Sequence, residues 1–108
     1  MKELVELLAK NSIVCKKLES VDISKLGSRK RIKIYLGVDI KGYYCTIFEV
    51  DQKSRFLSKD SQEMNMIFEK LEEYHQGKIG FRYILIKASM CSKAKVLLEV
   101  SGWNVWRF

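Results

Sequence analysis

Three carboxylates and a lysine lie close together in residues 37–53, GVDIKGYYCTIFEVDQK. The carboxylates belong to Asp39, Glu49 and Asp51, and the lysine is Lys53. Carboxylate oxygens bind divalent cations, and a nearby ammonium group stabilises negative charge on a reacting phosphate. This set would suit a metal-dependent nuclease. A hairpin that only exposes charged side chains to water would have the same composition, so the elements that position these residues decide between the two interpretations.

The pattern of apolar residues predicts that the four residues lie on a β-hairpin. Apolar and polar residues alternate strictly in RIKIYLGVDI, residues 31–40, which is typical of a half-buried strand. Residues 43–51 continue as a second strand, and SRFLS, residues 54–58, predicts a short third one. The apolar face of the first strand consists of Ile32, Ile34, Leu36, Val38 and Ile40.

Helical spacing predicts three helices and leaves two further strands. We expect helices over residues 2–19, from Asp60 to before Gly77, and from a Ser92 cap to before Gly102. FRYILIKA (81–88) is apolar on both faces at its centre, which indicates a strand inside the sheet, and WNVWRF closes the chain as the last strand.

These elements predict one α/β domain over residues 1–108. Their order is α-β-β-β-α-β-α-β, with a mixed sheet of about five strands. Residues 1–30 would hold the N-terminal helix and a basic connection, and residues 31–108 the mixed α/β core.

This order, together with Asp39 and the Glu49-x-Asp51 pair, resembles the PD-(D/E)XK nuclease superfamily over residues 3–88 at most. The resemblance implies that Asp39 and Glu49 bind Mg²⁺ or Mn²⁺ and that a lysine two residues after the second acid assists the chemistry. Asp51 occupies the lysine's position in this sequence, so Lys53 would have to take its role.

The turn of the hairpin decides whether the two acids meet. A two-residue turn, Lys41-Gly42, would place apolar and charged residues of the two strands on one face, whereas a three-residue turn ending at Tyr43 unites the apolar faces. With the three-residue turn, Asp39 lies opposite Cys45 on the second strand. Cys45 is four residues from Glu49 along that strand, a distance of roughly 13 Å. One cation with ligand bonds of about 2.0–2.6 Å cannot join Asp39 and Glu49. We therefore predict no metal site, no cofactor and no catalysis by this pair.

The topology also resembles the RNase H-like fold, which implies acids on the first strand, the first helix and the end of the fourth strand. Asp39 suits the first position, and the helix offers Glu69, Glu72 or Glu73. The fourth strand ends in Lys87-Ala88-Ser89 without an acid, so that site is also incomplete.

Charge predicts a partner that carries phosphates. Twenty basic residues against thirteen acidic ones give a net charge of +7 and a pI near 9.4, which attracts nucleic acid. The densest basic run is KLGSRKRIK, residues 25–33, although a solvated loop would have the same composition. Tyr35 could stack on a base. The predicted nucleic-acid-binding residues are Arg29, Lys30, Arg31, Lys33, Tyr35, Lys53 and Arg55.

Other classes of function have weaker support. Three cysteines without a CxxC pair and one histidine predict neither a disulfide framework nor a zinc site. Apolar runs fall far short of the ~20 residues that span a bilayer, and MKELVELLAK lacks a signal-peptide cleavage site, so we expect a cytoplasmic protein. Trp106 and Phe108 share a face of the last strand and indicate a contact patch. A protein-interaction module or homodimer is therefore the second alternative, after the nuclease.

Overall fold

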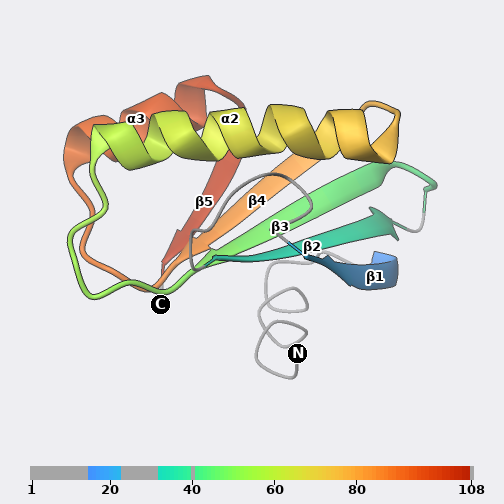
Figure 1. Cartoon of the computed structure of the whole chain (residues 1–108), viewed down its shortest axis with the longest axis horizontal. Helices are drawn as coiled ribbons and strands as arrows, with labels where there is room; N and C mark the ends of the chain where they lie inside the picture. Colours follow the sequence, from blue (N-terminus) through green and yellow to red (C-terminus); the bar gives the residue numbers. More distant parts are fainter. Residues whose placement is uncertain (1–14, 23–31, 40, 108) are drawn as a thin grey trace.

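The computed structural model describes residues 15–22, 32–39 and 41–107. Within them, five strands form one mixed sheet and two helices pack on it, in the chain order β-β-β-α-β-α-β (Figure 1). The predicted fold class, an α/β fold with a mixed sheet of about five strands, is confirmed. The elements are β1 (Cys15–Val21), β2 (Ile32–Asp39), β3 (Tyr44–Val50), α2 (Ser58–His75), β4 (Phe81–Ile86), α3 (Ser92–Val100) and β5 (Trp103–Arg107).

The sheet changes from antiparallel to parallel pairing at β3. β1, β2 and β3 form an antiparallel meander, and β3, β4 and β5 run parallel to one another. Parallel neighbours need a crossover connection, and α2 and α3 provide the two crossovers. β4 lies between β3 and β5 with Ile84, Leu85 and Ile86 buried. The prediction of an interior fourth strand is confirmed.

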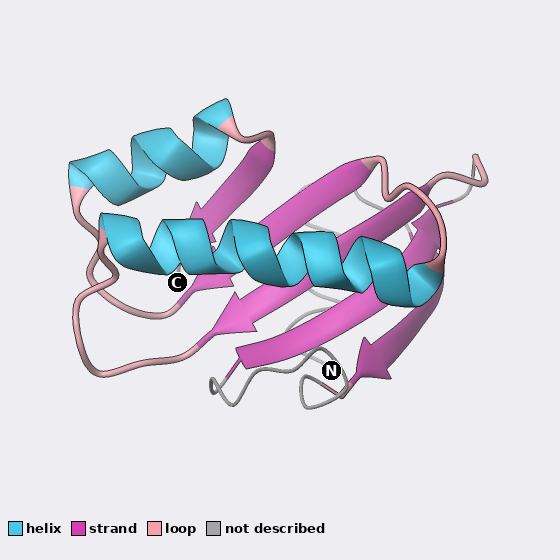
Figure 2. Cartoon of the chain, turned by 45° about the horizontal axis from the view of Figure 1, so that its top comes forward, coloured by secondary structure: helices cyan, strands magenta, loops and turns pink. Residues whose placement is uncertain are grey.

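Both described helices cover the same face of the sheet (Figure 2). Met64, Ile67, Phe68 and Leu71 of α2 are buried at helical spacing, because side chains three and four residues apart share one helix face. The indole Nε1–H of the buried Trp103 donates a hydrogen bond of 2.7 Å to Oδ1 of Asn65, which joins β5 to α2. Neither α2 nor α3 is long and apolar enough to cross a membrane.

The predicted helix over residues 2–19 is wrong in its last part, since residues 15–21 form β1; residues 2–14 lie outside the described residues. β1 pairs antiparallel with β2, with Val21 beside Ile34 and Leu18 beside Gly37. Val21 packs against the helix-covered core and Leu18 against the cluster on the other face. Backbone pairing with β2 and apolar contacts on both faces outweigh the helical spacing of the leucines here.

The predicted third strand over residues 54–58 is also wrong. Only Phe56 forms a bridge, with Met90. Its N–H donates to the carbonyl of Ser89 and its carbonyl accepts from the N–H of Cys91, at 2.8 and 3.1 Å. Phe56 itself is fully buried. This one-residue bridge holds together the two segments that lead into α2 and α3.

α2 starts earlier than the sequence predicts, and α3 has a different N-cap residue. α2 starts at Ser58, and Asp60 is its third residue, with Oδ2 accepting the N–H of Leu57 at 2.8 Å. At the start of α3, the Sγ of Cys91 accepts the N–H of Ala94. Ala94 and Leu98 form the buried side of α3, whereas Leu97 is 36% exposed.

Candidate nucleic-acid interface

The register of the β2–β3 hairpin keeps Asp39 away from Glu49. Val38 pairs with Tyr44, two residues from the predicted pairing of Ile40 with Tyr44. A shift of two residues preserves which face each side chain occupies, so each side chain lies on its predicted face. The distance between Asp39 and Glu49 along the hairpin is larger than predicted. Lys33 lies opposite Glu49, and Asp39 is six residues further along β2, about 20 Å away. Asp39 and Glu49 therefore do not fit a shared metal ion.

The carboxylate of Asp39 organises the turn. Its Oδ1 accepts the backbone N–H groups of Lys41 and Tyr43, both at 2.9 Å. The Asp39 backbone also exchanges hydrogen bonds with the turn, donating to Tyr43 and accepting from Gly42. Gly42 has a φ of +89°, a conformation that other residues adopt only with strain. Asp39 thus has a structural role in this hairpin.

Glu49, the second predicted acid, lies in a charged pocket of about 370 Å³ at the other end of the hairpin. The parallel register places Val50 beside Ile86, so Lys87 follows directly beyond the end of β4. The Nζ of Lys87 and Oε1 of Glu49 are 2.8 Å apart. We call this the charged pocket; its lining residues are Ile32, Lys33, Glu49, Asp51 and Lys87.

Sequence reasoning identified Lys33, Glu49 and Asp51 as site residues but missed Lys87. The sequence shows that Lys87 directly follows an apolar strand. The pairing of Leu85 with Glu49, which brings Lys87 close to Glu49, is visible only in the structure. The lysine near Glu49 is therefore Lys87, which follows the neighbouring strand β4. The position two residues after Glu49 in the sequence is Asp51.

The charged pocket contains two carboxylates and two ammonium groups. The ammonium of Lys87 already neutralises the Glu49 carboxylate, and Lys33 is on the opposing strand. The two ammonium groups balance the two carboxylates, so the pocket has no net negative charge to attract a divalent cation. Within the described residues, no group of three or more His, Cys, Asp or Glu side chains could hold a metal ion. The exposed Lys33 can instead bind an anion at the rim of this pocket.

The remaining predicted binding residues have different environments. Lys53 and Arg55 are exposed in the segment that follows β3, at the same end of the hairpin as Lys33. Arg29, Lys30 and Arg31 lie outside the described residues. Tyr35 is only 6% exposed and packs with Ile47, so little of its ring is accessible for stacking on a base.

The acids of the RNase H-like alternative do not gather with Asp39. Oε2 of Glu72 accepts the N–H of Ile79 at 3.0 Å, which fixes the loop that leads from α2 to β4. Glu69 lines a separate pocket with Arg82.

The predicted contact patch at the C-terminal strand is only partly described. Trp106 stacks on Tyr83 with ring centroids 5.0 Å apart, on the face opposite Trp103. The side chain of Phe108 lies outside the described residues.

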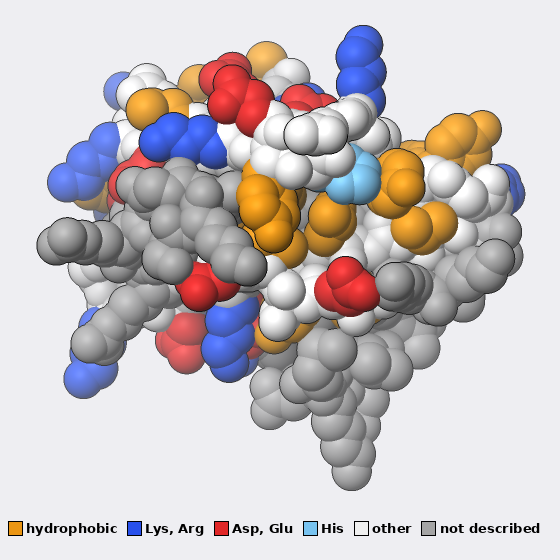
Figure 3. Space-filling model, turned by 45° about the vertical axis from the view of Figure 1, so that its right-hand side comes forward, with side chains coloured by type: hydrophobic (Ala, Val, Ile, Leu, Met, Phe, Trp, Pro, Cys, Tyr) orange, Lys and Arg blue, Asp and Glu red, His pale blue; other side chains and the backbone are white. Residues whose placement is uncertain are grey.

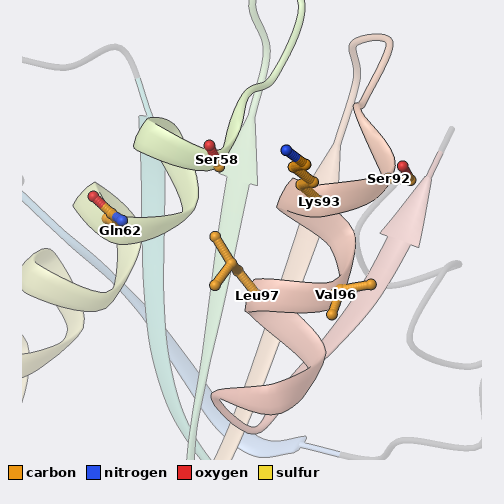
Figure 4. Close-up of a pocket in the computed structure, with 6 residues that line it drawn as sticks. All are labelled: Ser58, Gln62, Ser92, Lys93, Val96 and Leu97. Carbon is orange, nitrogen blue, oxygen red and sulfur yellow. The ribbon is translucent and has the colours of Figure 1, made fainter.

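A second pocket of about 430 Å³ lies between the first turns of α2 and α3 (Figure 4). Its lining consists of four polar and two apolar side chains, with no carboxylate and none of the predicted site residues. Its lining residues are Ser58, Gln62, Ser92, Lys93, Val96 and Leu97.

Comparison with known proteins identifies a shared fold. No protein-family model matches the chain, and no curated protein gives a significant match. The structure is similar to EndoMS in its apo form (TM-score 0.59, 19% identity, 99% of this chain and 45% of that chain). It is also similar to EndoMS in a complex with double-stranded DNA (0.53, 19%, 99% and 43%) and to a repair endonuclease from Pyrococcus abyssi (0.55, 18%, 99% and 46%).

The chain thus spans less than half the length of each of these proteins. At these identities the likeness shows the fold alone.

The role of Asp39 in the turn predicts the effect of replacing it. Asp39→Ala removes the acceptor of two backbone N–H groups, so we expect the free energy of unfolding to fall by about 1–2 kcal/mol. Asp39→Asn keeps an acceptor oxygen and should lose less. Denaturant unfolding followed by circular dichroism measures both, with Asp51→Ala as a control on the same hairpin. Unchanged stability in Asp39→Ala would contradict the structural role.

Proposed function

We propose that the chain is a nucleic-acid-binding domain with a nuclease-like fold, and that it binds backbone phosphates without catalysis by Asp39 and Glu49. The observation that carries the proposal is the exposure of Lys33, Lys53 and Arg55 at one end of the hairpin. The fold supports it, because EndoMS, which shares this fold, was solved with double-stranded DNA.

The charges around the charged pocket favour an anionic partner. Glu49, the acid closest to Lys33 across the hairpin, is neutralised by Lys87 and is only 13% exposed. Its negative charge therefore offsets little of the positive potential at this end. The exposed Asp51 adds one negative charge there, against the three positive charges of Lys33, Lys53 and Arg55. The basic run Arg29–Arg31 directly precedes β2 in the sequence and would add to that potential. Lysine and arginine contacts to phosphates position a strand without reading its sequence.

One observation favours a second candidate function, a metal-dependent nuclease. The Glu49–Lys87 ion pair, with Asp51 beside it in the charged pocket, places acids and a lysine together on adjacent strands. In that case Lys87 would assume the role that the sequence assigned to Lys53, and Mg²⁺ or Mn²⁺ would be required. The two lysines in the pocket make this candidate the weaker one.

The phosphate-binding proposal predicts a specific loss of affinity. Replacing Lys33, Lys53 and Arg55 together with Ala should weaken binding to all DNA and RNA sequences alike. The slope of log affinity against log salt should flatten by up to about one unit for each lost phosphate contact. Fluorescence anisotropy with labelled oligonucleotides over a series of salt concentrations measures both quantities.

The matched control removes three exposed lysines from the helices, Lys70, Lys93 and Lys95. It changes the net charge equally and should leave most of the affinity. Equal losses in the two triple variants would show that only the overall charge matters. A parent chain that binds neither DNA nor RNA at low salt would leave the protein-interaction alternative, for which salt has little effect.

The second prediction concerns cleavage. With Mg²⁺ or Mn²⁺ present, the parent should not cut DNA or RNA in a way that depends on Asp39 and Glu49, because these residues are far apart. Gel assays on plasmid DNA and on single-stranded oligonucleotides, with EDTA as a control, measure this. Cleavage that both Asp39→Ala and Glu49→Gln abolish would contradict the proposal. Cleavage that only Glu49→Gln and Lys87→Met abolish would establish the nuclease built on the charged pocket.

A further inference from the structure

Two pairs of aromatic side chains lie at the end of the sheet that is opposite to the charged pocket. Tyr44 is on the helix-covered face, as Phe48 is, and Phe81 is on the other face, as Tyr83 is. Tyr43 and Phe81 meet edge to face with ring centroids 6.0 Å apart, and Tyr44 and His75 do so at 4.3 Å. We call these four residues the aromatic cluster. On the surface, hydrophobic side chains gather around the histidine (Figure 3).

Three segments of the chain build the aromatic cluster. Tyr43 directly follows the turn that Asp39 organises, and Tyr44 begins β3. His75 is the last residue of α2, and Phe81 is the first residue of β4. The N–H of Gly80 donates to the carbonyl of Tyr44 at 3.0 Å, which fixes the loop before β4 against β3. The four rings are therefore held by regular elements rather than by a long loop.

The aromatic cluster contributes little to the core. Tyr43, Tyr44 and Phe81 are 58%, 42% and 40% exposed, although other aromatic residues such as Phe48 and Phe56 are fully buried. Exposed aromatic rings concentrated in one place indicate an interaction site. In an edge-to-face pair, the ring that contributes its edge keeps its flat faces available for another partner.

Charged side chains of both signs lie around the aromatic cluster. The carboxylates of Asp39 and Glu72 accept the backbone N–H groups of Tyr43 and Ile79. Residues 41–44 and 75–81 contain two lysines, Lys41 and Lys78, and no acid. Both lysines are exposed. Flat aromatic faces beside ammonium groups match a strand in which flat bases alternate with phosphates. The two lysines do not suit an apolar protein surface as the partner. A duplex does not suit the aromatic rings, because the faces of its bases are stacked on one another and inaccessible.

We propose that the aromatic cluster stacks on the unpaired bases of a single-stranded nucleic acid, whose phosphates contact Lys41 and Lys78. This inference rests on the proposed nucleic-acid-binding function and adds the class of ligand and a second surface. Lys33, Lys53 and Arg55, at the opposite end of the hairpin, would bind phosphates whether bases are present or not. The aromatic cluster requires the bases, so the two surfaces are tested separately.

The test compares two labelled single strands of about 12 nucleotides, a length typical of small single-strand binding sites. One strand carries adenine bases and the other is abasic, with the same phosphates. The parent should bind the strand with bases at least about fivefold more tightly, since stacking of even one base on an aromatic ring gives about this factor. Anisotropy titrations at fixed salt measure the preference.

Four variants separate ring stacking from apolar contact. Tyr43→Leu and Phe81→Leu keep apolar volume but remove a ring, and each should lose most of the preference for bases. Tyr43→Phe keeps the ring and should retain the preference, as should Val100→Ala, which removes an 81% exposed apolar side chain from α3. Circular dichroism confirms that each variant is folded, and the comparison of the two strands in the parent needs no variant.

Each outcome decides the inference. A preference for bases in the parent that Tyr43→Leu or Phe81→Leu removes supports base stacking. Equal affinity of the parent for both strands, or a preference that survives both leucine variants, overturns it. Either result leaves the proposed phosphate binding by Lys33, Lys53 and Arg55 intact. If the parent binds neither strand at low salt, the inference and the proposed function both fail.

Discussion

The β2–β3 hairpin pairs Lys33 with Glu49 and Val38 with Tyr44, and this register separates the two ends of the sheet. A strand shifted by an odd number of residues would turn every side chain to the other face and destroy the core. The observed register keeps Ile34 and Phe48 under the helices. It also fixes Asp39 at the turn, where its carboxylate holds backbone N–H groups instead of a ligand.

Because β4 pairs in parallel with β3, residues that are distant in the sequence lie side by side at both ends of the sheet. This pairing brings Lys87 beside Glu49 at one end, and Phe81 to the other end, where its ring meets that of Tyr43. The same strand pair therefore builds a charged pocket and an aromatic cluster about 20 Å apart, the length of a short strand. The two surfaces suit the two chemical components of a nucleic acid, the phosphate and the base.

Strong periodic patterns were sufficient to predict most of the fold. The alternation of residues 31–40 and the apolar run Ile84–Ile86 identified two strands, and the spacing of Met64 and Phe68 identified a helix. The sequence does not predict β1, because its two packed apolar residues, Leu18 and Val21, face opposite sides of the sheet. The strand therefore shows no alternation of apolar and polar residues. The ion pair of Lys87 was missed because a contact between parallel strands depends on a register that local sequence does not encode.

NMR can show whether a nucleic acid contacts both ends of the sheet. Titration of the isotope-labelled chain with a single-stranded oligonucleotide at low salt reports the perturbed amides. We predict perturbations at both ends, around Lys33 and Arg55 and around Tyr43 and Phe81. Perturbations confined to the outer faces of α2 and α3, or no perturbation at all, would contradict the prediction.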